Sequence, residues 1–268
     1  MATVAVIPAR FASTRFPGKP LAKDTGKYLI QHVYERVSDC RAVDRVIVAT
    51  DDERIVAAVK SFGGSACMTR ADHSSGTDRV GEVAASLDLA DDDLVLNVQG
   101  DEPEIGVSVL ETLIRKMGSG DASCRIGTLA APFSDDGPSK GVGSPLDPNC
   151  VKVVVDERGQ ALYFSRSLIP YPQRTGGWID RPSRFLLHLG VYAFRADTLC
   201  LITAGGGLGR ARLEEAELLE QLRWIEHGLP VAVVIVEHRI PGIDTPEDYA
   251  AFVKRISAAA KNVKAEVG

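Results

Sequence analysis

The chain has 268 residues, of which 45% are hydrophobic and 25% charged, so a disordered or low-complexity architecture is excluded. This length predicts a single domain over residues 1–268, with a subdomain over about 130–212. The net charge of −5 counts against a nucleic-acid-binding protein, and five scattered cysteines predict reduced thiols in the cytoplasm. No segment approaches the roughly 20 apolar residues of a membrane span, so we expect no membrane partner.

The first half of the chain alternates between strand and helix patterns. Short runs rich in β-branched residues predict strands over residues 3–7, 45–50, 93–98 and 231–237. The segments between them predict helices over residues 26–39, 52–62, 77–88 and 106–118. Continuously apolar strands are typical of a parallel sheet covered on both faces. The pattern therefore predicts an α/β fold with a mostly parallel central sheet, whose ligands bind beyond the carboxyl ends of the strands.

The second half begins with a β-rich region and ends in helices. Residues 150–167 form two strand-like runs around the turn DERG, which predicts a hairpin, and residues 188–194 predict another strand. Residues 213–228 predict one amphipathic helix. A final helix begins after Thr245, because Thr245 and Asp248 fit a capping box.

A cationic loop follows the first predicted strand, within the segment IPARFASTRFPGKPL. Its basic and hydroxyl side chains are Arg10, Ser13, Thr14, Arg15 and Lys19. One arginine can bind two phosphate oxygens at once, and lysine acts as a point charge. The loop therefore predicts a polyphosphate site. Neither a Walker A motif nor GxGxxG is present, which excludes a P-loop and a dinucleotide fingerprint. Taken alone, the loop also fits an ordinary solvated surface.

Two aspartates follow predicted strands. Asp101 lies just after the strand over residues 93–98, and Asp244 lies beyond the strand over residues 231–237. Carboxylates at strand ends of one sheet can converge on a hard cation such as Mg²⁺. The alternative is that Asp101 or Glu102 caps the following helix, and both interpretations of Asp101 stay open. Since Thr245 already supplies a cap, Asp244 is a spare carboxylate.

A polar loop with the sequence TRADHSSGTDRV enters the third predicted helix. The groups in it that could bind a ligand include Arg70, Ser75 and Gly76. Arg79 lies in the first helical turn, where the helix dipole disfavours a cation, so an anionic partner is expected. The alternative is a surface ion pair with Asp78 or Glu82.

Seven motifs occur in order between about residues 3 and 255. They are IPARFASTRFPGKPL, RADHSSGTDR, NVQGDEP, VKVVVDERGQALYFSRSLIP, HLGVYAFR, LEEAELLEQLR and GIDTPEDY. Together they closely resemble the 3-deoxy-manno-octulosonate (Kdo) cytidylyltransferases, also called CMP-Kdo synthetases. The resemblance implies a nucleotide-diphospho-sugar transferase-like α/β fold with a smaller β-rich dimerisation subdomain. It further implies Mg²⁺ dependence, a homodimer, and the reaction of CTP with Kdo to give CMP-Kdo and pyrophosphate for lipopolysaccharide biosynthesis.

The resemblance also implies roles for individual residues. The nucleotide would contact Arg10, Ser13, Thr14, Arg15, Lys19, Arg70, Ser75, Gly76 and Gln99. The metal would be held by Asp101 and Asp244, and the catalytic set would be Lys19, Arg10, Asp101 and Asp244. Kdo would contact Arg79, Gln99, His188, Glu217 and Gln221. Glu217 and Gln221 stand at i and i+4 on the predicted helix over 213–228, and therefore on one of its faces.

Two other functions remain open on the sequence alone. One is a cytidylyltransferase for another sugar acid, as in CMP-sialic acid synthetases. The other is a nucleotide-binding protein without catalysis, although the presence of both aspartates with the cationic loop counts against it. No HExxH or clustered His/Cys set occurs, so zinc is not expected.

Overall fold

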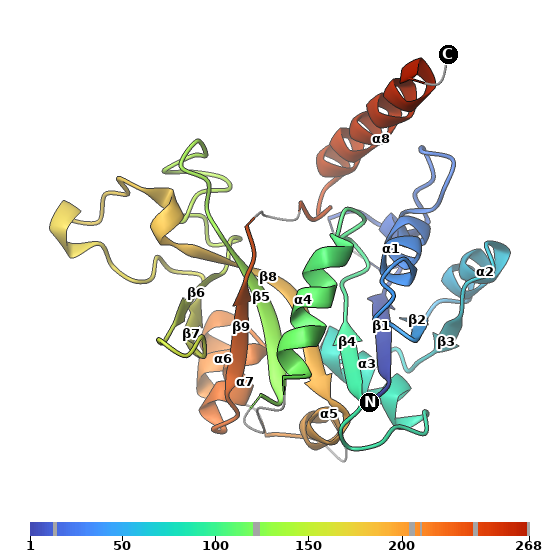
Figure 1. The fold of residues 1–268 in the computed structure, drawn as a ribbon, viewed down its shortest axis with the longest axis horizontal. Helices are drawn as coiled ribbons and strands as arrows, with labels where there is room; N and C mark the ends of the chain where they lie inside the picture. Colours follow the sequence, from blue (N-terminus) through green and yellow to red (C-terminus); the bar gives the residue numbers. More distant parts are fainter. Residues whose placement is uncertain (13–14, 120–123, 204–206, 210, 238–240, 267–268) are drawn as a thin grey trace. The chain divides into compact units, whose positions relative to one another are not determined.

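The computed structural model describes residues 1–12, 15–119, 124–203, 207–209, 211–237 and 241–266 (Figure 1). The chain divides into two compact units. The N-terminal unit comprises Val4–Val83, Asn97–Val107 and Ile240–Gly268, and the central unit comprises Met1–Thr3, Ala84–Leu96 and Ser108–Arg239. The predicted subdomain over about 130–212 stays a prediction.

The N-terminal unit contains parallel strands in the order β3-β2-β1. The strands are β1 (Thr3–Ala9), β2 (Arg45–Thr50) and β3 (Ala66–Met68). The helices are α1 (Leu29–Ser38), α2 (Glu53–Ser61), α3 (Gly76–Ala85) and α8 (Pro246–Glu266), and the 3₁₀ turn is η1 (Lys19–Leu21). β1 and β2 are buried almost continuously, as expected for strands covered on both faces. β3 was not predicted, because its sequence ACM contains no β-branched residue.

The central unit contains a mixed sheet in the order β4-β8-β5-β9, in which β5 runs parallel to β9 and antiparallel to β8. Its strands are β4 (Leu94–Asn97), β5 (Ile126–Pro132), β6 (Lys152–Val155), β7 (Ala161–Ser165), β8 (Leu186–Arg195) and β9 (Val231–Ile235). Its helices are α4 (Val107–Met117), α5 (Ala196–Thr203), α6 (Arg212–Glu217) and α7 (Gln221–Glu226), with 3₁₀ turns η2 (Gln173–Thr175) and η3 (Pro182–Arg184). The predicted hairpin is confirmed as β6 and β7, and long loops extend from the strands of this unit (Figure 1).

The predicted α/β class is thus confirmed, since parallel strands alternate with helices in the first third of the chain. The predicted single helix over 213–228 is wrong, because α6 and α7 are separate helices. None of the helices formed by the described residues is both long enough and apolar enough to cross a membrane.

The last helix, α8, packs against the first, α1. Leu29 of α1 and Ile243, Tyr249 and Phe252 of the C-terminal segment form one buried apolar cluster. The Tyr249 hydroxyl also accepts a hydrogen bond of 2.8 Å from the backbone N–H of Asp24. Since Ile243 belongs to this cluster, burial of apolar surface fixes the segment that carries Asp244.

Candidate active site

The cationic loop that follows β1 closes on itself. Gly18 has a φ of +73°, and its N–H donates to the Phe11 carbonyl at 3.0 Å. A Cβ at Gly18 would lie 3.2 Å from the Phe11 ring, so both the backbone angle and the close approach favour glycine. The guanidinium of Arg54 stacks 3.4 Å from the centre of the Phe11 ring, and Asp52 holds it through two hydrogen bonds. Ser13 and Thr14 lie outside the described residues.

Lys19 joins three segments of the N-terminal unit. Its Nζ donates to Asp101 Oδ2 and to the Ile243 carbonyl, both at 2.7 Å. The Ile243 N–H in turn donates to the Asp101 carbonyl at 2.9 Å. Because the Lys19 side chain is only 12% exposed, these bonds hold its ammonium group in one place. The loop after β1, the segment after β4 and the segment before α8 therefore meet at this lysine.

Asp244 is the spare carboxylate that the sequence predicts. The Thr245 hydroxyl accepts from the Asp248 N–H at 3.2 Å, and Asp248 accepts from the Thr245 N–H at 2.9 Å, so the capping box is confirmed. Burial opposes ionisation of Asp248, but the hydrogen bonds from Thr245 and Asp244 outweigh it and lower its pKa. The Asp244 carboxylate itself binds Arg15 at 2.8 Å, and their side chains are 51% and 59% exposed.

Asp101 does not cap a helix, because α4 begins only at Val107. The turn before it is tight, since a Cβ at Gly100 would lie 2.9 Å from the Pro8 carbonyl oxygen. No group of three or more His, Cys, Asp or Glu side chains within the described ranges is arranged to hold a metal ion. Asp101 and Asp244 therefore supply a two-carboxylate site at most, which fits Mg²⁺, since this ion commonly takes one or two carboxylates together with substrate phosphates.

The burial of Glu102, next to Asp101, was missed by the sequence analysis, which considered Glu102 only as a helix cap. Its side chain is buried, and Oε2 has no hydrogen-bond partner within the described part of the chain. Burial, together with the neighbouring Asp101 charge, raises the pKa of Glu102 well above its usual value. The sequence does carry a signal for this burial. Two adjacent acidic residues, Asp101 and Glu102, come shortly after a fully buried strand, and one of the two carboxylates faces the interior.

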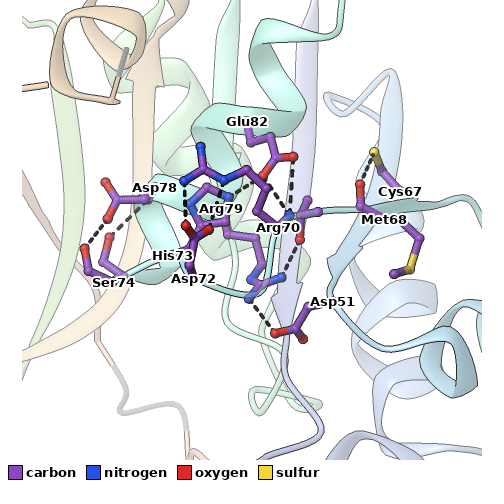
Figure 2. A network of polar contacts seen from close by, with 12 residues as sticks. Asp51, Cys67, Met68, Arg70, Asp72, His73, Ser74, Asp78, Arg79 and Glu82 are labelled. Atoms are coloured by element: carbon purple, nitrogen blue, oxygen red, sulfur yellow. Dashed lines mark hydrogen bonds and ion pairs between the residues drawn. The ribbon is translucent and has the colours of Figure 1, made fainter. Parts of the chain in front are cut away.

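The polar loop before α3 is held by contacts within the loop and to α3 itself (Figure 2). Arg70 forms two hydrogen bonds to Asp72, at 2.9 and 2.8 Å. The Ser75 hydroxyl accepts from the Asp78 N–H at 3.0 Å and so caps α3, whose first residue is Gly76. Arg10, from the cationic loop, donates to the His73 carbonyl. The structure thus brings Arg10 to the loop that carries Arg70, Ser75 and Gly76.

The alternative interpretation of Arg79, a surface ion pair with Asp78 or Glu82, is wrong. The Arg79 side chain is fully buried and donates to Thr69 and, at 3.1 Å, to Asp51 (Figure 2). Asp51 and Thr69 directly follow β2 and β3, so the guanidinium sits at the carboxyl ends of these strands. Its Nε has no partner among the residues that the structure describes. The role of Arg79 towards the Kdo carboxylate stays a prediction.

Glu82 pairs with His73 instead, and it also accepts from the Arg70 N–H at 3.1 Å. Burial acts against ionisation of Glu82, yet these hydrogen bonds lower its pKa below the usual value. Gln99 Nε2 donates to the side-chain oxygen Oδ1 of Asn97 at 3.1 Å, and Asn97 Nδ2 donates to the Thr77 hydroxyl at 3.3 Å. Gln99 is therefore joined to the start of α3, beside the cap at Ser75.

The remaining predicted sugar ligands belong to the central unit, and Glu217 is already engaged there. Its carboxylate accepts from the Ser165 hydroxyl at 2.5 Å and from the Arg166 N–H at 2.8 Å. The Arg166 guanidinium donates back to the Glu217 carbonyl at 2.7 Å, at the end of α6. Glu217 thus ties the end of α6 to the end of β7.

The expectation that Glu217 and Gln221 share one helix face is wrong. Leu218 adopts the left-handed conformation, with a φ of +53°, and ends α6. The bonds from Arg166 to the Glu217 and Leu218 carbonyls satisfy oxygens that a continuous helix would have used itself. Gln221 then begins α7 and is only 3% exposed.

His188 lies on β8, and its Nε2 is 3.0 Å from the Thr128 hydroxyl of β5. Loss of solvation by burial lowers its pKa to about 3. The imidazole is therefore neutral near pH 7, and it can only exchange hydrogen bonds with a ligand.

Sequence similarity covers almost the whole chain. A family model described as cytidylyltransferase matches residues 4–236. A 3-deoxy-manno-octulosonate cytidylyltransferase of Syntrophobacter fumaroxidans is 47% identical over 253 residues, which are 94% of this chain and 96% of that protein. One from Parabacteroides distasonis is 47% identical over 250 residues, covering 92% of this chain and 95% of that protein.

The comparison with solved structures agrees with the sequence comparison. The structure of a CMP:2-keto-3-deoxy-manno-octonic acid synthetase complexed with CTP matches with a TM-score of 0.82 and 42% identity, covering 98% of this chain and 100% of that one. A 4-diphosphocytidyl-2C-methyl-D-erythritol synthase from Anaerococcus prevotii matches with a TM-score of 0.57 at 15% identity, over 97% of this chain and 98% of that one. The second likeness concerns the fold alone.

Proposed function

The chain belongs to the 3-deoxy-manno-octulosonate cytidylyltransferase family, and on that premise we propose that it transfers the cytidylyl group of CTP to the anomeric hydroxyl of Kdo. The products are CMP-Kdo and pyrophosphate. The observation that carries the proposal is the junction at Lys19, where a held cation joins the two segments bearing Asp101 and Asp244. Such a junction supplies the positive and negative groups that a metal-bound triphosphate requires.

The transfer needs positioning and charge neutralisation more than covalent help from the protein. The anomeric hydroxyl attacks the α-phosphorus, the bond to the β-phosphate oxygen breaks, and charge grows on the leaving pyrophosphate. Arg10, Arg15 and Lys19 stabilise that charge, with Arg10 and Lys19 in the catalytic set. Exposed ion pairs contribute little to stability, so Arg15 can leave Asp244 for a phosphate at small cost. The remaining nucleotide contacts are assigned to Ser13, Thr14, Arg70, Ser75, Gly76 and Gln99.

Mg²⁺ is the proposed cofactor, held by Asp101 and Asp244. Their hard oxygen ligands and partial exposure suit this ion. When bound, the ion would polarise the α-phosphate and lower the pKa of the sugar hydroxyl. The chain's own contribution is to hold the two carboxylates on segments that Lys19 and the Ile243 backbone keep together.

The sugar acid is assigned to five residues of the predicted set. They are Arg79, Gln99, His188, Glu217 and Gln221. Gln221 is nearly buried at the start of α7, and its amide is assigned to a sugar hydroxyl.

A pyrophosphate-release assay tests the proposal. Four nucleoside triphosphates are crossed with Kdo and sialic acid, each with and without Mg²⁺. We expect release with CTP and Kdo in the presence of Mg²⁺. Release with sialic acid instead would reassign the sugar, and no release with any pair would remove the catalytic function.

We propose that the protein acts as a homodimer in the bacterial cytoplasm, in lipopolysaccharide biosynthesis. Free cysteines suit a reducing compartment. Large apolar side chains are exposed within the predicted dimerisation region, and such side chains favour an interface. They are Val142, Leu146, Leu162, Tyr171, Trp178 and Leu201. Light scattering coupled to size exclusion measures the mass, and a 28.7 kDa species would contradict the dimer.

A further inference from the structure

The imidazole of His188 is held on several sides within the central unit. Its ring centre lies 5.0 Å from that of Phe164 and 5.3 Å from that of Tyr192. Its backbone N–H donates to the Val151 carbonyl at 2.8 Å. The side chain's one hydrogen bond to a described residue joins Nε2 to the hydroxyl of Thr128, which is fully buried.

The direction of this hydrogen bond follows from a second contact. Thr128 Oγ1 also lies 2.7 Å from the Val191 carbonyl oxygen, which can only accept. The single hydroxyl proton is therefore donated to Val191, and Oγ1 must accept from His188. It follows that Nε2 carries a hydrogen. Because the ring is neutral at physiological pH, Nδ1 is left with a free lone pair.

The Val191 carbonyl is available because the sheet is irregular at this point. Between β5 and β8 the pairing steps from Thr128 with Tyr192 directly to Ala130 with His188. The extra β8 residues include Gly190, whose φ of +71° lets the chain bulge. A buried hydroxyl on the facing strand can thus bond a main-chain carbonyl and an imidazole at the same time.

We propose that Thr128 is a positioning residue, which fixes His188 as the Nε2–H tautomer so that Nδ1 accepts a hydrogen bond from a hydroxyl group of the sugar acid. The inference rests on the proposed function, in which His188 contacts Kdo. In this role His188 binds a hydroxyl group and not the carboxylate of the sugar, because a carboxylate has no hydrogen to donate to Nδ1. The sugar carboxylate must then be bound by another group.

The tautomer is measured on the wild-type protein, without substrate. Protein labelled with ¹⁵N in its histidines gives imidazole correlations in which the two ring nitrogens differ by protonation, and His188→Asn identifies the signals. We expect a single Nε2–H form at pH 7. An Nδ1–H form, or a charged ring, overturns the inference without any kinetic result.

Kinetics then separate positioning from general support of the fold. Thr128→Val removes the hydroxyl at nearly constant volume, and we expect it to raise the KM for Kdo by about tenfold, the value of one hydrogen bond, with the KM for CTP unchanged. Thr128→Ser keeps the hydroxyl and should restore the KM for Kdo to within about twofold of the wild type. Thr112→Val is the matched control, because Thr112 donates to the Ser108 carbonyl with no histidine attached.

The outcomes distinguish this inference from the proposed function. If the wild type forms CMP-Kdo but Thr128→Val leaves the KM for Kdo unchanged, or raises both KM values together, the positioning role is wrong. If the wild type forms no CMP-Kdo, the proposed function fails, and with it the sugar contact. Should Thr128→Val not fold, a Thr128→Ser protein with a changed tautomer contradicts the inference.

Discussion

In the N-terminal unit four candidate ligand residues bind one another in two ion pairs, whereas Glu217 and His188 of the central unit bind hydroxyl and backbone groups. Arg15 pairs with Asp244 and Lys19 with Asp101, side chain to side chain. Glu217 instead bonds the Ser165 hydroxyl and the Arg166 N–H. Ion pairs near solvent can exchange partners at little cost, whereas bonds that also close a chain turn cannot. The ion-paired residues of the N-terminal unit are therefore suited to binding and releasing charged ligands. The residues of the central unit are suited to holding one fixed geometry.

Removing Lys19, the less exposed cation of these two ion pairs, should have the largest effect. Lys19→Met removes the charge that we propose neutralises the phosphates, together with the bonds that join three segments. We expect kcat to fall by about 100- to 1,000-fold at saturating Mg²⁺, CTP and Kdo, because preorganised charge stabilisation is lost. Initial rates of pyrophosphate release measure the effect.

Lys23→Met is the matched control, since Lys23 lies in the same segment and contacts the Tyr28 ring rather than a carboxylate. Its kcat should stay within a few-fold of the wild type. Near-normal turnover of Lys19→Met would remove Lys19 from the catalytic set, and an equal loss in both variants would point to net charge alone.

Arg79 sharpens the comparison, because it belongs to the N-terminal unit but is fully buried. Arg79→Met leaves Asp51 and Thr69 without their partner and should lower the free energy of unfolding by about 3 kcal/mol. Arg70→Met is the control, since Arg70 and Asp72 form an exposed pair, and its denaturation midpoint should hardly move. Equal midpoints for the two variants would contradict the buried ion pair.

The same variant tests the predicted carboxylate contact. At a temperature where Arg79→Met is folded, a KM for Kdo that rises far more than the KM for CTP supports that contact. An unchanged KM for Kdo would take Arg79 out of the sugar set and leave it a purely structural role.

His188 gives the central unit a pH dependence. Its folded pKa of about 3 is below the ordinary 6.5, so the unfolded state takes up a proton first as the pH falls. The stability that His188 contributes is fully present above pH 6.5 and is lost as the pH falls towards 3. The loss in the free energy of unfolding is about 2 kcal/mol at pH 5. The lowered pKa of His32, caused mainly by burial, acts in the same direction.

Urea denaturation of the wild type and of His188→Asn between pH 7 and 5 measures this contribution. The wild type should lose more stability than the variant over that interval. Parallel curves would mean that the ring is solvated enough to keep an ordinary pKa, which would also weaken the case for a fixed tautomer.

The sequence predicted those features that depend on local pattern. Continuous apolar runs predicted β1 and β2, and the order of Thr245 and Asp248 predicted the cap of α8 and hence the free Asp244 carboxylate. It did not predict β5, whose sequence IGTLAAP has few β-branched residues and gains its place from pairing with β8 and β9.

The parts of the site that were missed depend on contacts between distant segments. The burial of Arg79 results from Asp51 and Thr69, which follow other strands. The break between Glu217 and Gln221 results from Arg166, which lies about fifty positions earlier in the chain. Helical periodicity alone favours a continuous helix there, and no glycine marks the turn.

A substitution at Leu218, in the turn between α6 and α7, has the smallest of the expected effects. Leu218 is held in the left-handed region although its side chain is 78% exposed. A left-handed leucine costs about 1–2 kcal/mol and glycine adopts the region freely, at a smaller entropic cost, so Leu218→Gly should stabilise the protein by up to about 1 kcal/mol. Since the turn is preserved, Glu217 and Gln221 keep their places, and the KM for Kdo should not change.

Leu201→Gly provides the opposite case, because Leu201 is an exposed leucine within α5, where glycine costs about 1 kcal/mol. Chemical denaturation of both variants gives the sign. If Leu218→Gly destabilised the protein as much as Leu201→Gly, the leucine side chain would be contributing packing that outweighs the backbone strain. The break between α6 and α7 would then be maintained by that packing, and the bonds from Arg166 would be its consequence.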